Sequence, residues 1–100
     1  MTVEISLEEA GATGRYLARL PGIDALSEMT FQRLPGNRVR INSTRVPEAL
    51  RGQGIAQLLV ERVVADAREQ GFTILPACSY VEAQARRHPD WQDVIELPAR

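Results

Sequence analysis

The strongest pattern of apolar and polar positions in the chain has the period of an α-helix and spans about 54–70. Apolar residues recur there at intervals of three and four, while charged residues fall mostly elsewhere on the circumference. Gly71 follows directly, and glycine is common just after the last turn of a helix. The apolar stripe consists of Ile55, Leu58, Leu59, Val63 and Ala67. The sequence therefore predicts a helix from about Gly54 to Gln70.

A period of two, which is typical of half-buried β-strands, marks the segments before this helix. Polar and apolar residues alternate over 38–43, and apolar residues occupy alternate positions over 3–7. Residues 16–20 form a further strand candidate that ends at a Pro-Gly turn, and the apolar segment 25–34 ends at the turn 35–37. We expect two or three antiparallel strands ahead of the helix.

The segment after the helix begins with a short apolar strand, 72–75, which stops at Pro76. A strand, a helix and a strand in succession imply a right-handed parallel crossover, so this strand is expected beside the one at 38–46. The run 80–87 favours a short helix that ends at His88, because the residue before a proline avoids the α region. The sequence thus predicts an α+β fold: antiparallel N-terminal strands, a parallel β-α-β crossover and a short C-terminal helix.

Length and composition fit one soluble globular domain over residues 1–100. Lys+Arg 12 against Asp+Glu 13 leave a net charge of -1, so no general field attracts nucleic acid or an anionic membrane. No apolar run approaches the length of a membrane span, and no secretory signal is visible. One cysteine and one histidine provide neither an internal disulfide nor a recognisable metal site. We expect a cytoplasmic monomer with no bound metal.

A glycine loop, Arg51-Gly52-Gln53-Gly54, lies between the last strand pattern and the helix. Such an arrangement points backbone N–H groups and the positive end of the helix dipole at an anion. Glycine lets a bulky ligand approach the main chain and allows a positive φ, and arginine adds a charge suited to phosphate. The loop is therefore a candidate phosphate site, although an ordinary glycine turn at a helix start has the same local sequence.

The spacing within this loop distinguishes between ligand classes. A dinucleotide fingerprint needs a third glycine where the chain has Gln57, and an ATP-type loop needs Gly-Lys followed by Ser or Thr, which does not occur. What remains is the pattern Arg51-x-x-Gly54-x-Ala56. This pattern resembles the pyrophosphate loop of the GNAT acyl-CoA acyltransferases.

Two further segments make the resemblance more specific. Residues 76–81 and 88–94, taken with 46–56, resemble the minimal GCN-related N-acetyltransferase-like proteins, a small branch of the GNAT superfamily. The similarity covers about 38–95, and the order and spacing of three motifs are more specific than any one of them. One departure is Ser43-Thr44, where the family usually has His-Thr.

The resemblance implies a GNAT-like mixed sheet in which two neighbouring parallel strands splay apart. It implies acetyl-CoA as co-substrate, with the pantetheine arm along the first of these strands and the pyrophosphate on the glycine loop. The thioester would point toward Cys78 and Tyr80. The residues implied in binding acetyl-CoA are Thr44, Arg45, Val46, Arg51, Gly52, Gln53, Gly54, Ile55, Ala56 and Ser79.

Cys78 and Tyr80 are the candidate catalytic residues, and each has a structural alternative. A phenol with a pKa of roughly 10 is protonated at neutral pH, so Tyr80 is a reasonable acid for the departing CoA thiolate. The alternative is that Tyr80 is an aromatic residue that packs on the sheet. Cys78, just before a helix, is either a transient acetyl acceptor or a small buried hydrophobe. Glu28 and Glu48 are possible bases for the incoming amine, and His88 is expected to cap or pack.

The main functional hypothesis is an acetyl-CoA-dependent N-acetyltransferase whose amine acceptor, a small molecule or a protein lysine, is unidentified. The alternative is a non-catalytic CoA- or acyl-CoA-binding module, because no base is singled out and the acceptor side is open. A third possibility is a domain whose two glycines, Gly52 and Gly54, only form a turn. Binding of CoA separates the third hypothesis from the others, and turnover of amines separates the first two.

Overall fold

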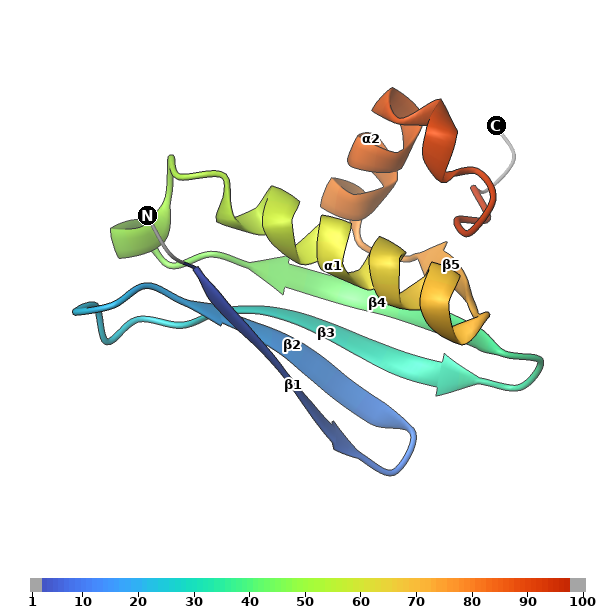
Figure 1. Ribbon diagram of the computed structural model, residues 1–100, viewed down its shortest axis with the longest axis horizontal. Helices are drawn as coiled ribbons and strands as arrows, with labels where there is room; N and C mark the ends of the chain where they lie inside the picture. Colours follow the sequence, from blue (N-terminus) through green and yellow to red (C-terminus); the bar gives the residue numbers. More distant parts are fainter. Residues whose placement is uncertain (1–2, 98–100) are drawn as a thin grey trace.

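The computed structural model describes residues 3–97 and shows a five-stranded mixed sheet with two α-helices (Figure 1). The strands follow one another across the sheet in sequence order, β1-β2-β3-β4-β5. Short 3-10 turns, η1 and η2, precede α1 and follow α2. The bounds are β1 Glu4–Ala10, β2 Thr13–Arg19, β3 Ser27–Leu34, β4 Arg38–Arg45, η1 Glu48–Leu50, α1 Ile55–Gln70, β5 Thr73–Pro76, α2 Ser79–Arg87 and η2 Pro89–Trp91. The predicted α+β class is confirmed.

The first four strands form an antiparallel meander, and β4 pairs in parallel with β5 across the α1 crossover. The expected position of β5 beside β4 is therefore confirmed. The expectation of two or three antiparallel strands is wrong, because four strands precede α1. The strand that the pattern did not define is β3, whose buried positions are Ser27, Met29 and Phe31. Since the first of these is polar, the apolar alternation is too short to mark the whole strand.

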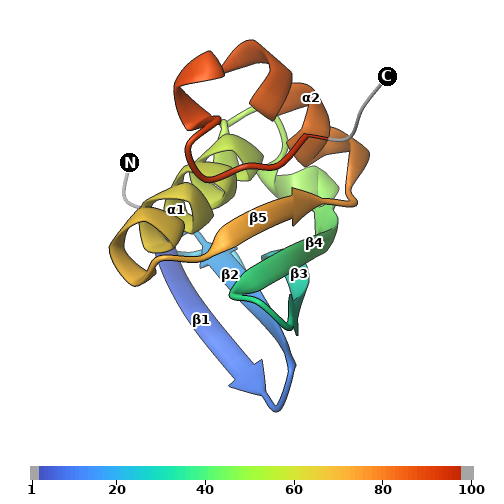
Figure 2. The same ribbon diagram turned by 90° about the vertical axis from the view of Figure 1, so that its right-hand side faces the viewer.

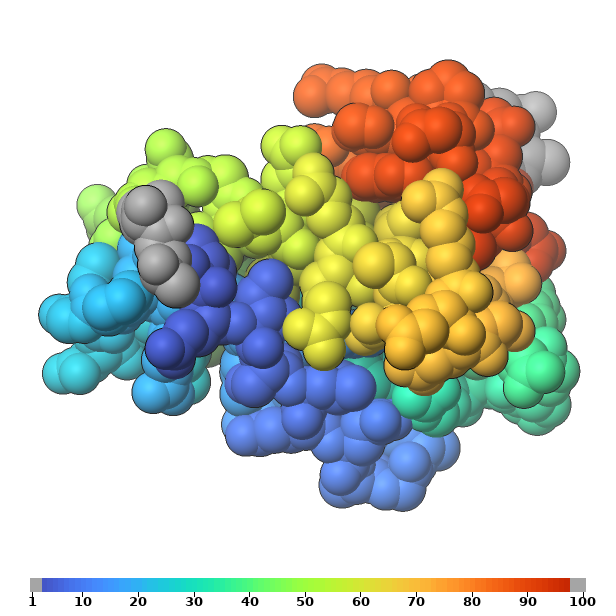
Figure 3. All heavy atoms as spheres, viewed as in Figure 1, coloured from blue at the N-terminus to red at the C-terminus, as the bar shows by residue number. Residues whose placement is uncertain are grey.

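The helix α1 covers one face of the sheet and supplies much of the core. Figure 2 shows α1 against the twisted sheet and α2 above β5. In Figure 3, α1 lies between the blue residues of β1 and β2 and the red C-terminal residues. Leu59 and Val63 are fully buried, and burial of such a side chain stabilises the fold by about 1.5–3 kcal/mol. Leu58, expected in the apolar stripe, is instead exposed, and Val60 and Val64 are buried.

Glycine stands at both ends of α1, and both glycines adopt the left-handed conformation. Gly54 precedes the first turn with φ 72°, and Gly71 follows the last turn with φ 80°. The Gly71 N–H donates to the Ala67 carbonyl, which satisfies one of the free carbonyl groups at the helix end. The helix bounds expected from the sequence are thus confirmed by the conformations of the two glycines.

A buried polar cluster joins α1 to β2 within the core. The Tyr16 hydroxyl donates to Asp66 Oδ2 at 2.7 Å, and Arg62 Nε donates to both oxygens of that carboxylate at 3.2 Å. Asp66 is 8% exposed, so a buried carboxylate receives hydrogen bonds from two partners. Burial raises the pKa of Tyr16, and the hydrogen bond to Asp66 raises that pKa further.

Replacing Tyr16 with phenylalanine is expected to lower the free energy of unfolding by about 1–3 kcal/mol, because Asp66 loses a buried donor. Urea unfolding at neutral pH measures this, with Tyr80→Phe, at a half-buried position, as the matched control. A raised pKa means that the folded protein keeps a proton that the unfolded chain loses. The wild type should therefore lose stability as the pH rises above about 10, and Tyr16→Phe should lose less. Equal losses would contradict this account.

The C-terminal residues close the outer edge of β5. The Ile74 N–H donates to the Val94 carbonyl at 2.7 Å, and the Glu96 N–H donates to the Ile74 carbonyl at 2.9 Å. Trp91 is buried, and the His88 ring stacks on it with ring centroids 4.0 Å apart. The packing role expected for His88 is confirmed. Within residues 3–97, no helix combines the length and apolar character that crossing a membrane requires.

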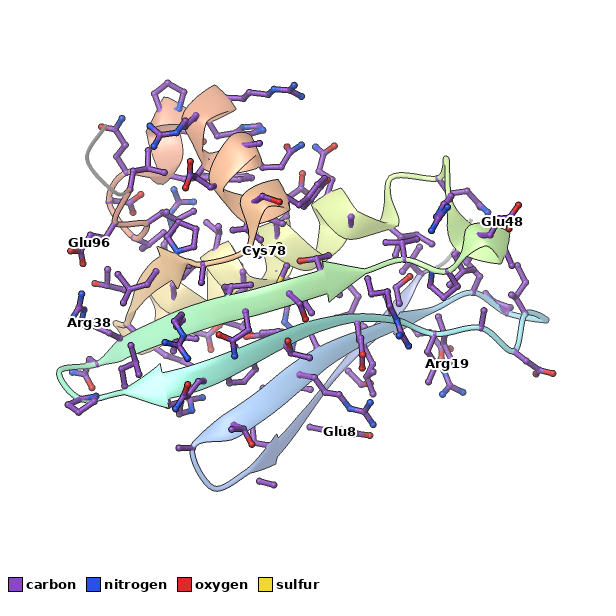
Figure 4. The ribbon with its side chains drawn as sticks, turned by 180° about the vertical axis from the view of Figure 1, so that it is seen from behind. Glu8, Arg19, Arg38, Glu48, Cys78 and Glu96 are labelled. Carbon is purple, nitrogen blue, oxygen red and sulfur yellow. The ribbon has the colours of Figure 1, made fainter. Side chains whose placement is uncertain are left out.

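The opposite face of the sheet carries no helix. Figure 4, seen from behind, shows the strands in front of both helices. Polar side chains form cross-strand pairs on this open face, including Thr30 with Ser43 at 2.6 Å between their hydroxyl oxygens. Arg15 binds both Glu8 and Glu28 there, at 2.9 and 3.0 Å. The sheet is thus buried on one side and solvated on the other.

Candidate functional site

The start of α1 has the features of an anion site. Gly54 provides no side-chain cap, and the first turn of the helix contains no acidic residue. The first N–H groups of a helix have no intrahelical acceptor, and they are usually satisfied by a capping side chain. Here neither a capping side chain nor a carboxylate in the first turn neutralises the positive end of the helix dipole. The N–H groups of 55–57 are therefore left to solvent or to a ligand.

A pocket of about 270 Å³ lies over this helix start. Its wall combines the glycine loop, residues of the first turn of α1, Val46 after β4 and the Tyr80 side chain from α2. The pocket brings together seven of the residues that the sequence analysis selected. They are Val46, Arg51, Gly52, Gly54, Ile55, Ala56 and Tyr80.

Other predicted residues lie outside this pocket wall. Thr44 and Arg45 end β4, Cys78 and Ser79 begin the α2 segment, and Gln53 is a half-buried loop residue. Two residues that line the pocket, Leu50 and Gln57, were not predicted as site residues from the sequence. The signal for Leu50 was its place as an apolar residue next to the loop, and it is fully buried.

The two loop glycines open the pocket to close approach by a ligand. Gly52 has φ 80° and Gly54 has φ 72°, a conformation that side chains with a Cβ rarely adopt. A Cβ built on either residue would have no atom within 4 Å, so the space beside this backbone is free. The loop therefore presents bare main chain to the pocket.

Arg51 is held against the loop by the main chain of the preceding segment. Its Nε donates to the Val46 carbonyl oxygen at 3.1 Å, and the residue is exposed. This bond engages the Nε atom and leaves the two terminal nitrogens of the guanidinium group available to a ligand. A positive charge thus stands beside the uncapped helix start, which is a suitable combination for a phosphate group.

The strands β4 and β5 separate close to the pocket. Their pairing ends at Ile41 and Pro76, and the Ala77 N–H donates to the Ile41 carbonyl at 3.0 Å. β4 continues to Arg45, so its last residues have no partner in β5. The strand edge at Thr44 and Arg45 is therefore exposed to whatever lies between the two strands.

A β-bulge in β4 marks the same region. Thr30 of β3 pairs with Ser43, but its neighbour Phe31 pairs with Ile41, so Asn42 is the extra residue. A bulge bends the strand and increases its local twist, and this bulge directly follows Ile41, the last residue of β4 that pairs with β5. The sequence analysis missed Asn42. The available signal was the run of polar residues over 42–45, which ends the alternation of 38–41.

Cys78 lies at the mouth of the gap between these strands. It is 9% exposed, and its thiol donates to Thr44 Oγ1 at 3.6 Å. The contact joins the end of β4 to the start of α2, for which Cys78 is the residue before the first turn. The two predicted residues Thr44 and Cys78 are thus brought together, and the cysteine is buried.

Tyr80 faces the pocket from the first turn of α2. Burial raises the pKa of its phenol, the neighbouring Arg87 opposes that shift, and the phenol therefore stays protonated in the physiological range. Of the two possible bases, Glu28 is bound by Arg15 at 3.0 Å on the open face, and Glu48 is exposed on the turn η1. The structure favours neither of them as a free base next to Tyr80.

The comparisons with known proteins agree on one family. Residues 15–94 match the family model of the GCN5-related N-acetyl-transferases, and the chain therefore belongs to this family. It is similar to a GCN5-like protein from Staphylococcus aureus solved by NMR, with a TM-score of 0.71 and 25% identity over 95% of this chain and 91% of that chain.

A second solved structure shares the fold. It is the ribosomal-protein-alanine N-acetyltransferase from Brucella melitensis biovar Abortus 2308, with a TM-score of 0.70 and 16% identity over 99% of this chain and 95% of that chain. No curated protein matches the sequence. The predicted GNAT-like mixed sheet and the resemblance to small GNAT proteins are confirmed.

Proposed function

We propose that the protein is an acetyl-CoA-dependent N-acetyltransferase that transfers the acetyl group to an amine. One observation carries the proposal: a pocket over the uncapped start of α1, which is lined by Gly52, Gly54 and Tyr80. The pocket lies close to the point where β4 and β5 separate. Membership of the GCN5-related family supports the same reaction class.

The residues of the pocket fit the pyrophosphate of CoA. The N–H groups of 55–57 and the Arg51 guanidinium supply donors and positive charge, and the bare glycine backbone allows close contact. The first turn of α1 contains no acidic residue to repel the anion. In this proposal the residues Arg51 to Ala56 hold the pyrophosphate.

The end of β4 fits the pantetheine arm. This arm carries amide groups, and a strand edge without a partner offers N–H and C=O groups that pair with amides as another strand would. Such an edge begins after Ile41 and includes Thr44 and Arg45. Val46, at the end of this segment, lines the pocket, so the strand edge leads into the pyrophosphate site. In this proposal the thioester lies near Cys78 and Tyr80.

The reaction needs few groups from the protein. The neutral amine attacks the carbonyl carbon of the thioester, the carbon–sulfur bond breaks, and the thiolate takes up one proton while the new amide nitrogen loses one. In this proposal Tyr80 donates the first proton, and its raised pKa, which keeps the phenol protonated, supports that role. Water on the open side of the site accepts the second proton.

Calorimetry with CoA and with acetyl-CoA tests the binding half of this proposal, and turnover of a panel of amines, polyamines and lysine peptides tests the chemical half. We expect both ligands to bind with similar affinity and at least one amine to be acetylated. Binding of CoA without turnover of any amine would favour the non-catalytic CoA-binding module. Failure to bind either ligand would remove both functions.

The acetyl group is expected to pass directly to the amine and not through Cys78. The buried thiol donates to Thr44 Oγ1, and the thiolate is the nucleophilic form of cysteine. The Cys78→Ser variant should therefore keep its rate within about tenfold of the wild type, since a covalent nucleophile would be worth far more. Mass spectrometry after brief exposure to acetyl-CoA should show no adduct. An acetylated Cys78, together with an inactive serine variant, would establish the covalent route instead.

A further inference from the structure

The arginines on the open face of the sheet differ in their partners. Two of them bind a glutamate: Arg15 binds Glu8 and Glu28, and Arg38 binds Glu96 at 3.4 Å. Arg19 and Arg45 form no ion pair within residues 3–97, but each lies opposite a glutamate in the register of the strands, Glu4 and Glu28 respectively. Arg40 is the exception among the described residues of this face, because its cross-strand neighbours are Gln32 in β3 and Leu75 in β5.

Neutral amides hold the Arg40 guanidinium in place. Its Nη2 donates to Gln32 Oε1 at 2.5 Å, and its Nε donates to Asn42 Oδ1 at 2.9 Å. These bonds orient the group without neutralising it, and within residues 3–97 no ion pair reaches it. A positive charge that is held in place but not compensated is the state of an arginine that binds an anion.

A pocket of about 270 Å³ lies beside Arg40 on this face. The other side of the pocket is apolar, with Leu75, Pro76, Ala77 and Leu97. Glu96 also lines it, but Arg38 engages that carboxylate, and Figure 4 shows the two side chains together at the β5 side of the sheet. The uncompensated charge of this pocket is therefore the positive charge of Arg40.

This pocket lies next to the proposed position of the acetyl group. Arg40 and Leu75 form the pair just before the last one between β4 and β5, which is Ile41 with Pro76. Ala77 lines the pocket and directly precedes Cys78. A molecule with one end at Arg40 and its chain along the apolar wall would thus extend toward the gap between the strands.

A larger hollow elsewhere on the described structure is less suited to a charged acceptor. It has a volume of about 480 Å³ and lies at the hairpin of β1 and β2. Its acidic residues already have arginine partners: Glu8 is bound by Arg15, and Glu9 is bound by Arg33 at 2.7 Å. Because these charges compensate one another within the protein, this hollow offers no charge for recognition.

We propose that the amine acceptor carries a carboxylate, which the Arg40 guanidinium binds in the pocket formed with Leu75 and Ala77. This inference rests on the proposed acetyl transfer and names its substrate class, short amino acids with the amine and the carboxylate at opposite ends of an apolar chain. A single guanidinium with two nitrogens already engaged matches the one charge of a carboxylate better than the double charge of a phosphate. Arg40 is then a specificity-determining residue.

Turnover of matched amines tests the inference. γ-Aminobutyrate and n-butylamine differ in having a carboxylate or a methyl group at the end of the same chain. We expect the wild type to prefer γ-aminobutyrate by roughly tenfold or more in kcat/KM, the value of one charge-assisted hydrogen bond. Arg40→Gln should remove this preference and leave the rate with n-butylamine and the Kd for CoA unchanged. Arg19→Gln, on the same face but opposite Glu4, is the matched control and should keep the preference.

A second measurement does not depend on turnover. In NMR spectra of the CoA-bound protein, γ-aminobutyrate should shift the amide signals of Arg40, Leu75 and Ala77 in the wild type but not in Arg40→Gln. If these shifts occur and no amine is acetylated, acetyl transfer is the part that fails and the carboxylate site stands. If amines are acetylated with no preference for the carboxylate, the inference is overturned and acetyl transfer stands. No shifts, or a preference for phosphoethanolamine over γ-aminobutyrate, would also overturn it.

Discussion

Replacing Gly54 with valine is expected to weaken CoA binding by at least about a hundredfold, because several charge-assisted hydrogen bonds at the start of α1 are lost together. Gly54 has φ 72°, which a β-branched residue resists, and its Cβ would project into the free space beside the loop. The variant would both distort the first turn of α1 and fill the place proposed for the pyrophosphate. Calorimetry with CoA measures the effect.

Gly22→Val is the matched control for this experiment. Gly22 also has a positive φ, 79°, and its Cβ would meet no atom within 4 Å, but it lies in the turn before β3 and outside the pocket. The two variants should therefore lose similar stability in urea unfolding, while only Gly54→Val loses affinity for CoA. Unchanged affinity in Gly54→Val would refute the proposed position of the pyrophosphate, and equal loss in both variants would show a general effect of backbone strain.

Replacing Tyr80 with phenylalanine is expected to lower kcat by about a hundredfold or more, the usual contribution of a positioned general acid. The ring and its packing remain, so the Kd for CoA should stay the same. An acid works only in its protonated form, and burial raises the pKa of Tyr80. Any loss of wild-type activity through this group should therefore begin only above about pH 10, the ordinary value for tyrosine. Steady-state kinetics against pH measures both effects.

Tyr16→Phe serves as the control for the loss of a hydroxyl. Tyr16 lies in β2 and binds Asp66 under α1, away from the pocket wall, so its replacement should alter stability and leave kcat unchanged. A Tyr80→Phe variant with wild-type kcat would assign Tyr80 a packing role. In that case the proton for the thiolate would come from water.

The sequence alone predicts those elements whose pattern lies within one short stretch of the chain. The period of α1 and the glycines at its ends predict the helix, because a helix buries one stripe and must terminate its free carbonyl groups. β3 was not defined, because its first buried position is Ser27, which no apolar pattern reveals. Leu58 was misplaced in the stripe, because the side of α1 that faces the sheet is set by packing as well as by period.

The residues of the candidate site also divide into those that the sequence predicts and those that it does not. The glycine loop and Tyr80 were selected from motifs, and the structure brings them to one pocket. Asn42 and Arg40 were not selected. The bulge at Asn42 arises from register between strands, and the isolation of Arg40 depends on its neighbours Gln32 and Leu75 across the sheet. The polar run 42–45 shows that the alternation ends, but the position of the bulge and the neighbours of Arg40 follow only from knowing which residues face each other.

The two margins of the sheet differ in how readily a strand of another molecule could pair with them. At the β5 margin, Ile74 already forms hydrogen bonds with Val94 and Glu96. At the β5 margin, the C-terminal segment already occupies the place that an incoming strand of another molecule would take. The β1 margin has no such cover within residues 3–97, but it bears Glu4, Glu8 and Glu9. Charged side chains along an edge strand disfavour pairing with a strand of another molecule, so the β1 margin is protected by its charged residues instead of by a covering segment.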